Sequence, residues 1–393
     1  MREVKLLAGT KQIEKSVLEP FSEEACDFLA ELSSELRNHP KAKQYPDVRT
    51  FAFWCRKANL SKLKNFFLDN HTMRRIGRGI VFHIAPSNVP VNMGFTYAFG
   101  LLAGNANVVR VSTKAFGQID VICEAMEKVF LQERFERIRR MTSIVSYPHD
   151  KEITAHYSAM CNSRVIWGGD RTIEEIRETE LPSRSNEITF ADRYSFGILN
   201  AKEVGMLEED ALRELTDKFY NDTYLMDQNA CSSPHLLFWL HAETSVKKRF
   251  WDAVYQAAQK YELADSKVSE KYTLLCESAI DHDHILQIHR YSNLLYVIEL
   301  ENMSYVDSDC RGKYGMFYEM DIKSLEQICP LINEKVQTCL YFGVNPEQIG
   351  QLIQEYSLCG MDRIVPFGQS LDIGLYWDGY DIIRSLSRCV EVI

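Results

Sequence analysis

The sequence lacks the features that would carry the chain into or across a membrane. No apolar run among its 393 residues reaches the roughly 18–20 residues that a spanning helix needs. The first residues, MREVKLLAGTKQIEKS, contain neither the long apolar core nor the small-residue cleavage site of a secretory signal. These two absences predict a cytoplasmic protein.

Basic charge is scarce as well. The chain has 45 lysine and arginine residues against 55 aspartate and glutamate residues, a formal net charge of −10. A general nucleic-acid-binding protein needs a basic surface that displaces counterions from phosphates. We therefore expect no nucleic-acid partner, although the balance still allows a local basic pocket for one phosphate.

The spacings typical of metal sites are missing too. The 11 cysteines are odd in number and include no C-x-x-C pair, which suits free thiols in a reducing compartment and argues against zinc. His282-Asp283-His284 could suggest a metal, but the surrounding ESAIDHDHILQIHRYS has the pattern of an amphipathic helix. Because adjacent helix positions do not face one ligand point, we expect no metal site.

What the sequence does contain is an alternation of short strands with amphipathic helices. Two helical periodicities, at 22–39 and 49–67, occupy the first 75 residues. Beyond them, helical stretches alternate with apolar or β-branched runs near 80–84, 106–111, 142–147, 163–169 and 194–199. This pattern predicts βαβ units and a parallel sheet, whose ligands bind at the carboxyl ends of the strands.

A second α/β region begins near Asn200 and includes a helix at 208–227 followed by a strand at 235–240. Residues 363–388 read as a strand, a loop and a terminal helix. The whole chain is therefore expected to form two α/β lobes.

Two positions suit nucleophilic catalysis. Cys231 lies in DQNACSSP, between the helix and the strand just named, where a loop thiol can be accessible and where nearby backbone N–H groups lower its pKa. A small buried structural cysteine is the ordinary alternative. Asn88 follows the strand at 80–84, and its amide could stabilise a developing oxyanion or cap the next helix.

Two further patches suit a nucleotide. Gly168 and Gly169, in WGGD, could let the backbone approach a pyrophosphate at a helix N-terminus, although a plain strand-to-helix turn has the same composition. The segment VVRVSTK ends a strand, where Arg110, Ser112, Thr113 and Lys114 could hold a ribose or a phosphate. The ordinary alternative is a solvated strand end.

These four patches occur together and in order, and in that combination the chain resembles the aldehyde dehydrogenase superfamily. GRGIVFHIAPSNVPVNMGFTYAFGLLAGNANVVRVSTK is similar to its cofactor-domain signature, VIWGGD to its glycine turn and DQNACSSP to its nucleophile loop. DQNACSSPH and RIVPFGQSLDIGLYWDGYDIIRSLSR most resemble the long-chain acyl-CoA reductase (fatty-acid reductase) family of bacterial luminescence. The match runs from about Gly79 to the C-terminus.

The resemblance implies an α/β, aldehyde-dehydrogenase-like fold that combines a Rossmann-type cofactor domain with an α/β catalytic domain. Residues 1–75 are expected to form a leading helical segment packed on the cofactor domain, and residues 76–199 the nicotinamide-cofactor-binding domain. Residues 200–362 are expected to form the catalytic domain, and residues 363–393 a C-terminal segment that returns to the cofactor domain.

Roles for single residues follow from the same resemblance. Cys231 takes the place of the nucleophile, Asn88 that of the oxyanion donor and Arg110 that of the residue contacting the adenosine ribose. Gly168 and Gly169 take the places beside the cofactor phosphates. Aldehyde dehydrogenases have a Glu-Leu-Gly-Gly segment whose glutamate activates water. The corresponding stretch here is LPSRSNEI, in which only Glu187 could replace that glutamate.

The implied activity is NADPH-dependent reduction of an acyl-CoA, or another acyl thioester, to an aldehyde through a cysteine-bound acyl group. Hydride rather than water would resolve this acyl-enzyme, which agrees with the missing water-activating segment. Thr113 stands where an acidic residue disfavours NADP, and the cations Arg110 and Lys114 suit a 2′-phosphate.

The expected associations are a homo-oligomer and an acyl-protein synthetase partner. Two alternatives stay open. One is a conventional NAD(P)-dependent aldehyde or semialdehyde dehydrogenase, which would need Glu187 as its base. The other is an acyl-transfer subunit of a multi-enzyme complex, in which Cys231 would carry an acyl group without reducing it.

Overall fold

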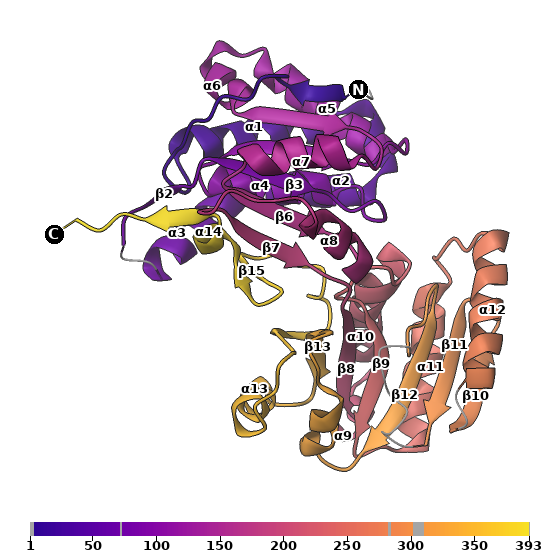
Figure 1. The fold of residues 1–393 in the computed structure, drawn as a ribbon. Coiled ribbons are helices and arrows are strands. Elements are labelled where there is room, and N and C mark those ends of the chain that lie inside the picture. Colours follow the sequence, from indigo (N-terminus) through magenta and orange to yellow (C-terminus); the bar gives the residue numbers. More distant parts are fainter. Residues whose placement is uncertain (1–3, 71–72, 282–283, 302–309, 393) are drawn as a thin grey trace. The chain divides into compact units, whose positions relative to one another are not determined.

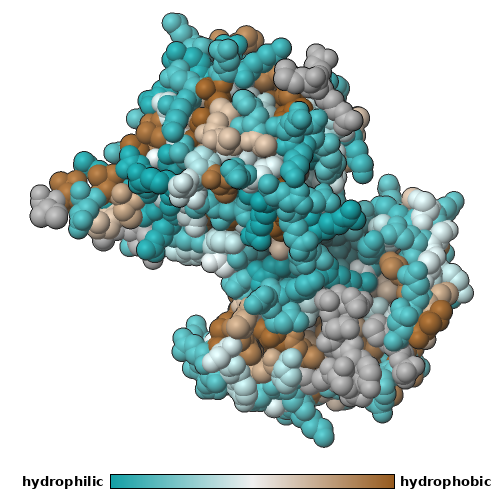
Figure 2. All heavy atoms as spheres, viewed as in Figure 1, coloured by the Kyte–Doolittle hydropathy of each residue, from teal (hydrophilic) through white to brown (hydrophobic). Residues whose placement is uncertain are grey.

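The structure, a computed structural model, describes residues 4–70, 73–281, 284–301 and 310–392. They form two compact units (Figure 1). Unit 1 comprises residues 1–191 and 374–393, and unit 2 comprises residues 192–373. No helix in the described ranges is both long and apolar enough to cross a membrane, and the face seen in Figure 2 is mostly hydrophilic.

Unit 1 is built on a six-stranded sheet with the order β1-β5-β4-β3-β6-β7. Neighbouring strands are parallel except β1, which pairs antiparallel with β5 at one edge. All five residues of the central β3 are buried, as expected of a parallel sheet covered on both faces. The strands are β1 (Lys5–Gly9), β3 (Ile80–Ile84), β4 (Ala106–Val111), β5 (Thr142–Ser146), β6 (Ser163–Trp167) and β7 (Asn186–Phe190).

Helices connect these strands and pack along the sheet (Figure 1). Two of them begin at capping side chains, because the Ser22 hydroxyl accepts the Ala25 N–H and the Asp150 carboxylate accepts the N–H groups of Glu152 and Ile153. The helical segments are α1 (Glu23–Asn38), η1 (Pro40–Gln44), α2 (Pro46–Trp54), α3 (Lys57–Asn70), α4 (Asn92–Leu102), α5 (Gly117–Phe130), η2 (Glu133–Phe135), α6 (Glu136–Arg140), α7 (Lys151–Met160) and α8 (Asp170–Arg177).

The C-terminal segment returns to unit 1 and pairs with the segment that leads into β3. Strand β17 (Ser387–Cys389) is antiparallel to β2 (Arg75–Gly77). The buried Arg75 guanidinium donates to Ser387 Oγ at 2.8 Å and to the Arg384 carbonyl at 2.7 Å, which holds the two segments together. Short elements precede this pairing, namely β15 (Tyr376–Trp377), β16 (Tyr380–Asp381) and α14 (Ile382–Ser385).

Unit 2 contains a seven-stranded sheet with the order β10-β11-β12-β9-β8-β13-β14. It is parallel except for β10, which is antiparallel to β11 at one edge. The strands are β8 (Tyr194–Asn200), β9 (Pro234–Leu240), β10 (Ile285–Tyr291), β11 (Leu295–Leu300), β12 (Met316–Ile322), β13 (Val336–Phe342) and β14 (Arg363–Pro366).

Two apolar clusters form the core of unit 2. Alternate residues of β9 divide between them: Leu236 and Phe238 belong to one cluster, Leu237 and Trp239 to the other. The sheet is therefore buried on both faces. The helical segments that cover it are α9 (Ala201–Gly205), α10 (Glu209–Thr223), η3 (Tyr224–Met226), α11 (Thr244–Ala258), α12 (Asp265–Asp281), η5 (Leu325–Leu331) and α13 (Pro346–Glu355).

The prediction of an α/β fold with parallel sheets is confirmed, with local differences. Strand β1 lies in the first 75 residues, which we expected to be helical. Strand β8 belongs to the second sheet, so the division between the units falls after Ala191 rather than at residue 199. The C-terminal return begins at Gly374 rather than at residue 363, and the segment ends in a strand rather than in a helix.

The predicted helix around ESAIDHDHILQIHRYS is wrong in its second half. Helix α12 ends at Asp281, and residues 285–291 form the edge strand β10, because they pair with β11 across the turn at Ser292. Of the cluster His282-Asp283-His284, residues 282 and 283 lie outside the described residues. The described residues contain no group of three or more potential metal ligands.

An ion cluster around the buried side chains of Lys247 and Glu319 joins α11 to the sheet of unit 2. The Lys247 Nζ lies 2.7 Å from Glu299, 2.9 Å from Asp321 and 3.3 Å from Glu319. Only 2 % of the Glu319 side chain is exposed. Its carboxylate also accepts the indole N–H groups of Trp239 and Trp251, both at 2.7 Å. This cluster fixes β9, the strand that follows Cys231.

We predict that Lys247→Met lowers the free energy of unfolding of unit 2 by about 3–5 kcal/mol, because it leaves the Glu319 charge buried without its cation. Urea unfolding followed by tryptophan fluorescence reports on this region, since two tryptophans contact Glu319. The control Lys248→Met breaks an exposed pair with Asp252 and should cost about 0–1 kcal/mol. Equal losses in the two variants would contradict the prediction.

Candidate active site

Cys231 lies in unit 2, between η3 and the start of β9, and its side chain is partly exposed. Pro234 begins β9 at once, so the cysteine stands at the N-terminal end of a central strand of the sheet. None of the eleven cysteines, all within the described residues, forms a disulfide. The position is that of an accessible loop thiol rather than of a core residue.

The buried side chain of Gln228 anchors this loop. Its Oε1 accepts the N–H groups of Gly315 at 2.6 Å and Met316 at 3.2 Å, and its Nε2 donates to the Met316 carbonyl at 3.1 Å. These bonds tie the cysteine loop to the turn before β12. Asp227 and Gln228 both have left-handed backbones, with φ of 54° and 58°, a conformation that costs a non-glycine residue about 1–2 kcal/mol.

Two further contacts hold the other side of the loop. The Ser195 hydroxyl at the start of β8 donates to the Cys231 carbonyl at 2.6 Å and accepts the Thr338 N–H of β13 at 3.2 Å. The Ser233 hydroxyl donates to the Asp222 carbonyl at 2.7 Å. The sequence did not single out Ser195, because it lies 36 residues from the cysteine and its role depends on strand pairing.

Asp222 links the end of α10 to the loop that follows β14. Its carboxylate accepts the N–H groups of Gly368 at 2.5 Å and Ser370 at 3.0 Å. Burial raises the pKa of this carboxyl to about 6, despite those hydrogen bonds. Asp222 therefore fixes the Phe367–Ser370 loop beside the helix that leads into the cysteine loop.

Asn88 lies in unit 1, in the exposed loop after the carboxyl end of β3. It does not cap the next helix, because α4 begins at Asn92 and its N-cap position is Val91. Within the described residues its side-chain amide has no hydrogen-bond partner. The structure therefore excludes the capping alternative. Among the described residues, no structural hydrogen bond occupies this amide.

A pocket of about 280 Å³ opens at the carboxyl ends of the unit 1 strands. Arg110 lines it from β4, and its Nη2 donates to the Tyr147 carbonyl at 3.2 Å. Burial lowers the pKa of this guanidinium. Arg110 forms no ion pair within the described residues, so the pocket contains a partly buried cation that an anionic ligand could neutralise.

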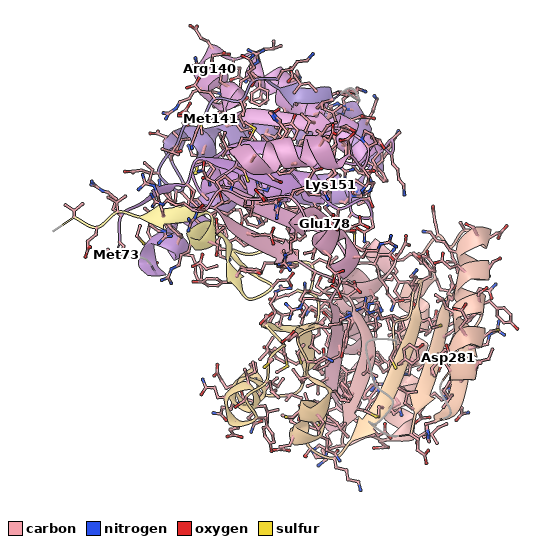
Figure 3. All side chains as sticks on the ribbon, viewed as in Figure 1. Met73, Arg140, Met141, Lys151, Glu178 and Asp281 are labelled. Atoms are coloured by element: carbon pink, nitrogen blue, oxygen red, sulfur yellow. The ribbon has the colours of Figure 1, made fainter. Side chains whose placement is uncertain are left out.

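Helices α7 and α8 form the walls of this pocket, through residues that include Thr154 and Thr172. At its rim the exposed Lys151 and Glu178 form an ion pair at 2.7 Å, and Figure 3 shows the two side chains next to each other. A nucleotide lying between the two helices would fit this setting, because phosphates and sugars bind at the carboxyl ends of parallel strands.

The other predicted cofactor residues lie close to this edge. Ser112, Thr113 and Lys114 follow the end of β4, although they do not line the pocket itself. Gly168 and Gly169 form the turn between β6 and α8. A Cβ on Gly169 would meet nothing within 4 Å, so its backbone faces open space that a ligand could occupy.

Glu187, the candidate for a water-activating base, is held by two arginines. It lies near the start of β7, and its carboxylate is held by Arg164 at 2.5 Å and Arg177 at 2.7 Å. Only 2 % of the Arg164 side chain is exposed. Both carboxylate oxygens of Glu187 are therefore engaged in ion pairs, and its catalytic role stays a prediction.

Comparison with known proteins adds a family and a fold. Residues 58–389 match the family described as acyl-CoA reductase (LuxC). The long-chain acyl-protein thioester reductase of Vibrio harveyi is 23 % identical over 344 residues, which cover 82 % of this chain and 65 % of the relative. The chain thus spans just under two thirds of that relative's length.

Solved aldehyde dehydrogenases share the fold. Aldehyde dehydrogenase 21 of Physcomitrella patens superposes with a TM-score of 0.64 at 10 % identity, over 93 % of this chain and 84 % of that one. Lactaldehyde dehydrogenase of Escherichia coli gives 0.64 at 11 % identity, over 94 % and 86 %. A glyceraldehyde-3-phosphate dehydrogenase of Methanocaldococcus jannaschii, solved with NADP, gives 0.61 at 13 % identity, over 93 % and 88 %. The predicted aldehyde-dehydrogenase-like fold is confirmed.

We predict that Glu187→Gln lowers the free energy of unfolding of unit 1 by about 3 kcal/mol or more, because the Arg164 charge stays buried without its carboxylate. Denaturant unfolding measures the loss. Replacing Glu178, whose ion pair with Lys151 is exposed, should cost much less. A stable Glu187→Gln protein that has lost only the ability to hydrolyse an acyl-enzyme would show instead that Glu187 is a base.

Proposed function

The chain belongs to the acyl-CoA reductase (LuxC) family, and on that premise we propose that it reduces an acyl-CoA or another acyl thioester to an aldehyde. The name of the Vibrio harveyi relative, an acyl-protein thioester reductase, supports this substrate class. The observation that carries the proposal is the Cys231 loop, in which a partly exposed thiol is flanked by buried, hydrogen-bonded residues.

In the proposed reaction the Cys231 thiolate attacks the carbonyl carbon of the thioester. A bond forms between Sγ and that carbon, and the Asn88 amide donates to the developing oxyanion. The oxyanion collapses, the original C–S bond breaks, and the leaving thiolate departs with its electron pair. The acyl group remains on Cys231 as a new thioester.

When bound, a reduced nicotinamide cofactor supplies the hydride that converts this acyl group to the aldehyde level. The bond between Cys231 Sγ and the carbonyl carbon then breaks, the aldehyde leaves and the thiolate is restored. No water takes part, so the sequence of steps needs no base of the kind that Glu187 was a candidate to provide.

We propose NADPH as the cofactor. Arg110, Ser112, Thr113 and Lys114 would hold the adenosine ribose and its 2′-phosphate, and Gly168 and Gly169 would lie beside the pyrophosphate. The partly buried Arg110, which has no carboxylate partner in the described residues, supports an anionic ligand at this place. Lys114 and the hydroxyls of Ser112 and Thr113 follow the end of β4, and this set suits a ribose 2′-phosphate better than an unmodified ribose.

The two alternatives are less well supported. Oxidation of aldehydes would require a water-activating base, whereas Glu187 is held by two arginines. A simple acyl-transfer subunit would have no use for the pocket at Arg110. A homo-oligomer and an acyl-protein synthetase partner remain part of the proposal, as associations that deliver the substrate and complete the assembly.

We predict that Cys231→Ala abolishes formation of an acyl-enzyme from acyl-CoA while NADPH binding is retained, because the residues proposed to hold the cofactor do not include Cys231. Intact-mass spectrometry measures the acyl adduct, and fluorescence titration measures cofactor binding. Cys359→Ala, which removes an exposed thiol elsewhere, is the control. Undiminished acylation of Cys231→Ala would assign the nucleophile to another cysteine.

Asn88→Ala should slow acylation by roughly 10²–10³, the usual loss on removing one oxyanion donor. Because Asn88 is exposed and caps no helix, its thermal unfolding should match that of the parent protein. Rapid-quench measurement of the acyl-enzyme tests this directly. A change below about threefold, against that same range, would remove Asn88 from the oxyanion site.

Arg110→Ala should remove most of the preference for NADPH over NADH. One charge-assisted hydrogen bond to the 2′-phosphate contributes about 1.5–3 kcal/mol, which corresponds to a preference of about tenfold or more. Binding titrations of both cofactors to the parent and to the variant measure this, with the surface substitution Arg134→Ala as the control. Equal affinity of the parent for the two cofactors would contradict the proposed specificity.

A further inference from the structure

Two left-handed turns face each other beside the cysteine loop. Asp227 and Gln228 form one turn, and Tyr314 and Gly315, with φ of 56° and 84°, form the other. The Tyr314 N–H donates to the Asp227 carbonyl at 3.4 Å, and the Gly315 N–H donates to the Gln228 side chain at 2.6 Å. Because three of the four residues are not glycine, their backbones depend on surrounding contacts to keep this conformation.

One face of helix α12 supplies those contacts. Lys267, Glu270 and Lys271 are spaced three and four residues apart, so their side chains share that face. The Lys267 Nζ lies 2.9 and 2.8 Å from the two carboxylate oxygens of Asp227. The Glu270 carboxylate accepts the Tyr314 hydroxyl at 2.8 Å. Asp227 also accepts the hydroxyl of Tyr261, which follows α11.

Lys271 is the least expected member of this face. It is fully buried, and its Nζ donates to the Tyr314 carbonyl at 2.7 Å and to the Asn293 carbonyl at 3.0 Å. It lies 4.4 Å from the centre of the Tyr296 ring. Burial, together with Arg290, lowers the pKa of this ammonium group to about 7.

A buried ammonium group without a carboxylate partner is a poor source of stability. No ion pair of Lys271 occurs within the described residues, and its charge is balanced only by two carbonyls and a ring. An apolar side chain of similar length would fill the same space without the cost of burying a charge. Both of its hydrogen bonds end on turns, one on Tyr314 beside the Gln228 side chain and the other on Asn293, which points to a role in placing these turns.

We propose that Lys267, Glu270 and Lys271 are positioning residues that hold the two left-handed turns together and so place Cys231 for attack on the thioester. This inference rests on the proposed function, since it concerns the same thiol. Asp227 and Gln228 stand four and three residues before Cys231, so relaxation of their backbones would displace the nucleophile. None of the three α12 residues is proposed to touch substrate.

Two variants separate positioning from folding. Lys271→Met nearly keeps the volume of the side chain, shortens it by one atom and removes its hydrogen bonds and its charge. Asp227→Asn removes the carboxylate charge but retains a residue that tolerates left-handed backbone. Lys267→Arg keeps a cation opposite Asp227 and is the conservative rescue. Lys248→Met, which breaks an exposed ion pair on α11, is the matched control.

Each purified protein, with residues 1–393, is studied in three ways. Thermal unfolding reports stability, amide hydrogen exchange of residues 227–231 reports the loop, and rapid-quench mass spectrometry reports acylation by a saturating medium-chain acyl-CoA. We expect Lys271→Met to unfold within about 3 °C of the parent, to exchange these amides at least tenfold faster and to acylate about 10–100-fold more slowly, because small displacements of a nucleophile are costly.

The same pattern is expected of Asp227→Asn, whereas Lys267→Arg and Lys248→Met should resemble the parent. The double variant Lys267→Met/Asp227→Asn should acylate no more slowly than either single variant, because both changes break the same ion pair. The inference is overturned if the amides of residues 227–231 exchange at the parent rate in Lys271→Met and Asp227→Asn. It is also overturned if these amides exchange faster but the acylation rate stays within threefold of the parent. A parent protein that forms no acyl-enzyme would contradict the proposed function instead, and the exchange rates would still show whether the α12 residues hold the two turns together.

Discussion

The side-chain amide of Gln228 is buried, and its three hydrogen bonds join the segment before β9 to the segment before β12. A buried amide that lost these partners would leave two backbone N–H groups and a carbonyl unsatisfied, at a cost of about 1–3 kcal/mol for each group. Ser195 adds a bond to the Cys231 carbonyl from the next strand. The cysteine thus stands on backbone fixed by three strands of the sheet, and the proposed chemistry depends on that placement.

Charge is distributed unequally between the two units, in a way that suits their proposed roles. Unit 2 has 29 acidic and 16 basic residues, a formal net charge of −13, whereas unit 1 has 26 acidic and 29 basic residues, a net charge of +3. The acidic balance of the whole chain therefore comes from the unit that contains Cys231. The unit that contains Arg110 has the weakly basic balance that favours an anionic dinucleotide.

The sequence predicted the parts of this site that depend on local signals. The helix at 208–227 and the strand at 235–240 placed Cys231 in the loop between them, and the apolar run at 80–84 placed Asn88 after a strand. It could not predict partners that only the fold brings together. Ser195 contacts Cys231 through strand pairing, and Lys271 reaches a turn 43 residues away.

Glu187 is a second case in which the position of a residue along the chain does not predict its partners. Position along the chain suggested that it could replace a catalytic glutamate, but β7 pairs with β6 and so places it against Arg164. The edge strand β10 read as a helix for a similar reason. None of its seven residues is buried, so burial leaves no period-2 pattern along the strand, and pairing with β11 decides the structure.

The central claim is that an acyl group rests on Cys231 between thiol release and reduction. The most direct measurement is a single-turnover experiment in two stages. Acyl-CoA is first mixed with enzyme without cofactor, and free CoA is counted. NADPH carrying deuterium at the transferable position is then added. The account predicts release of one CoA per chain in the first stage and an aldehyde deuterated at its carbonyl carbon in the second. Release of CoA only after NADPH is added, or a carboxylic acid as the product, would contradict it.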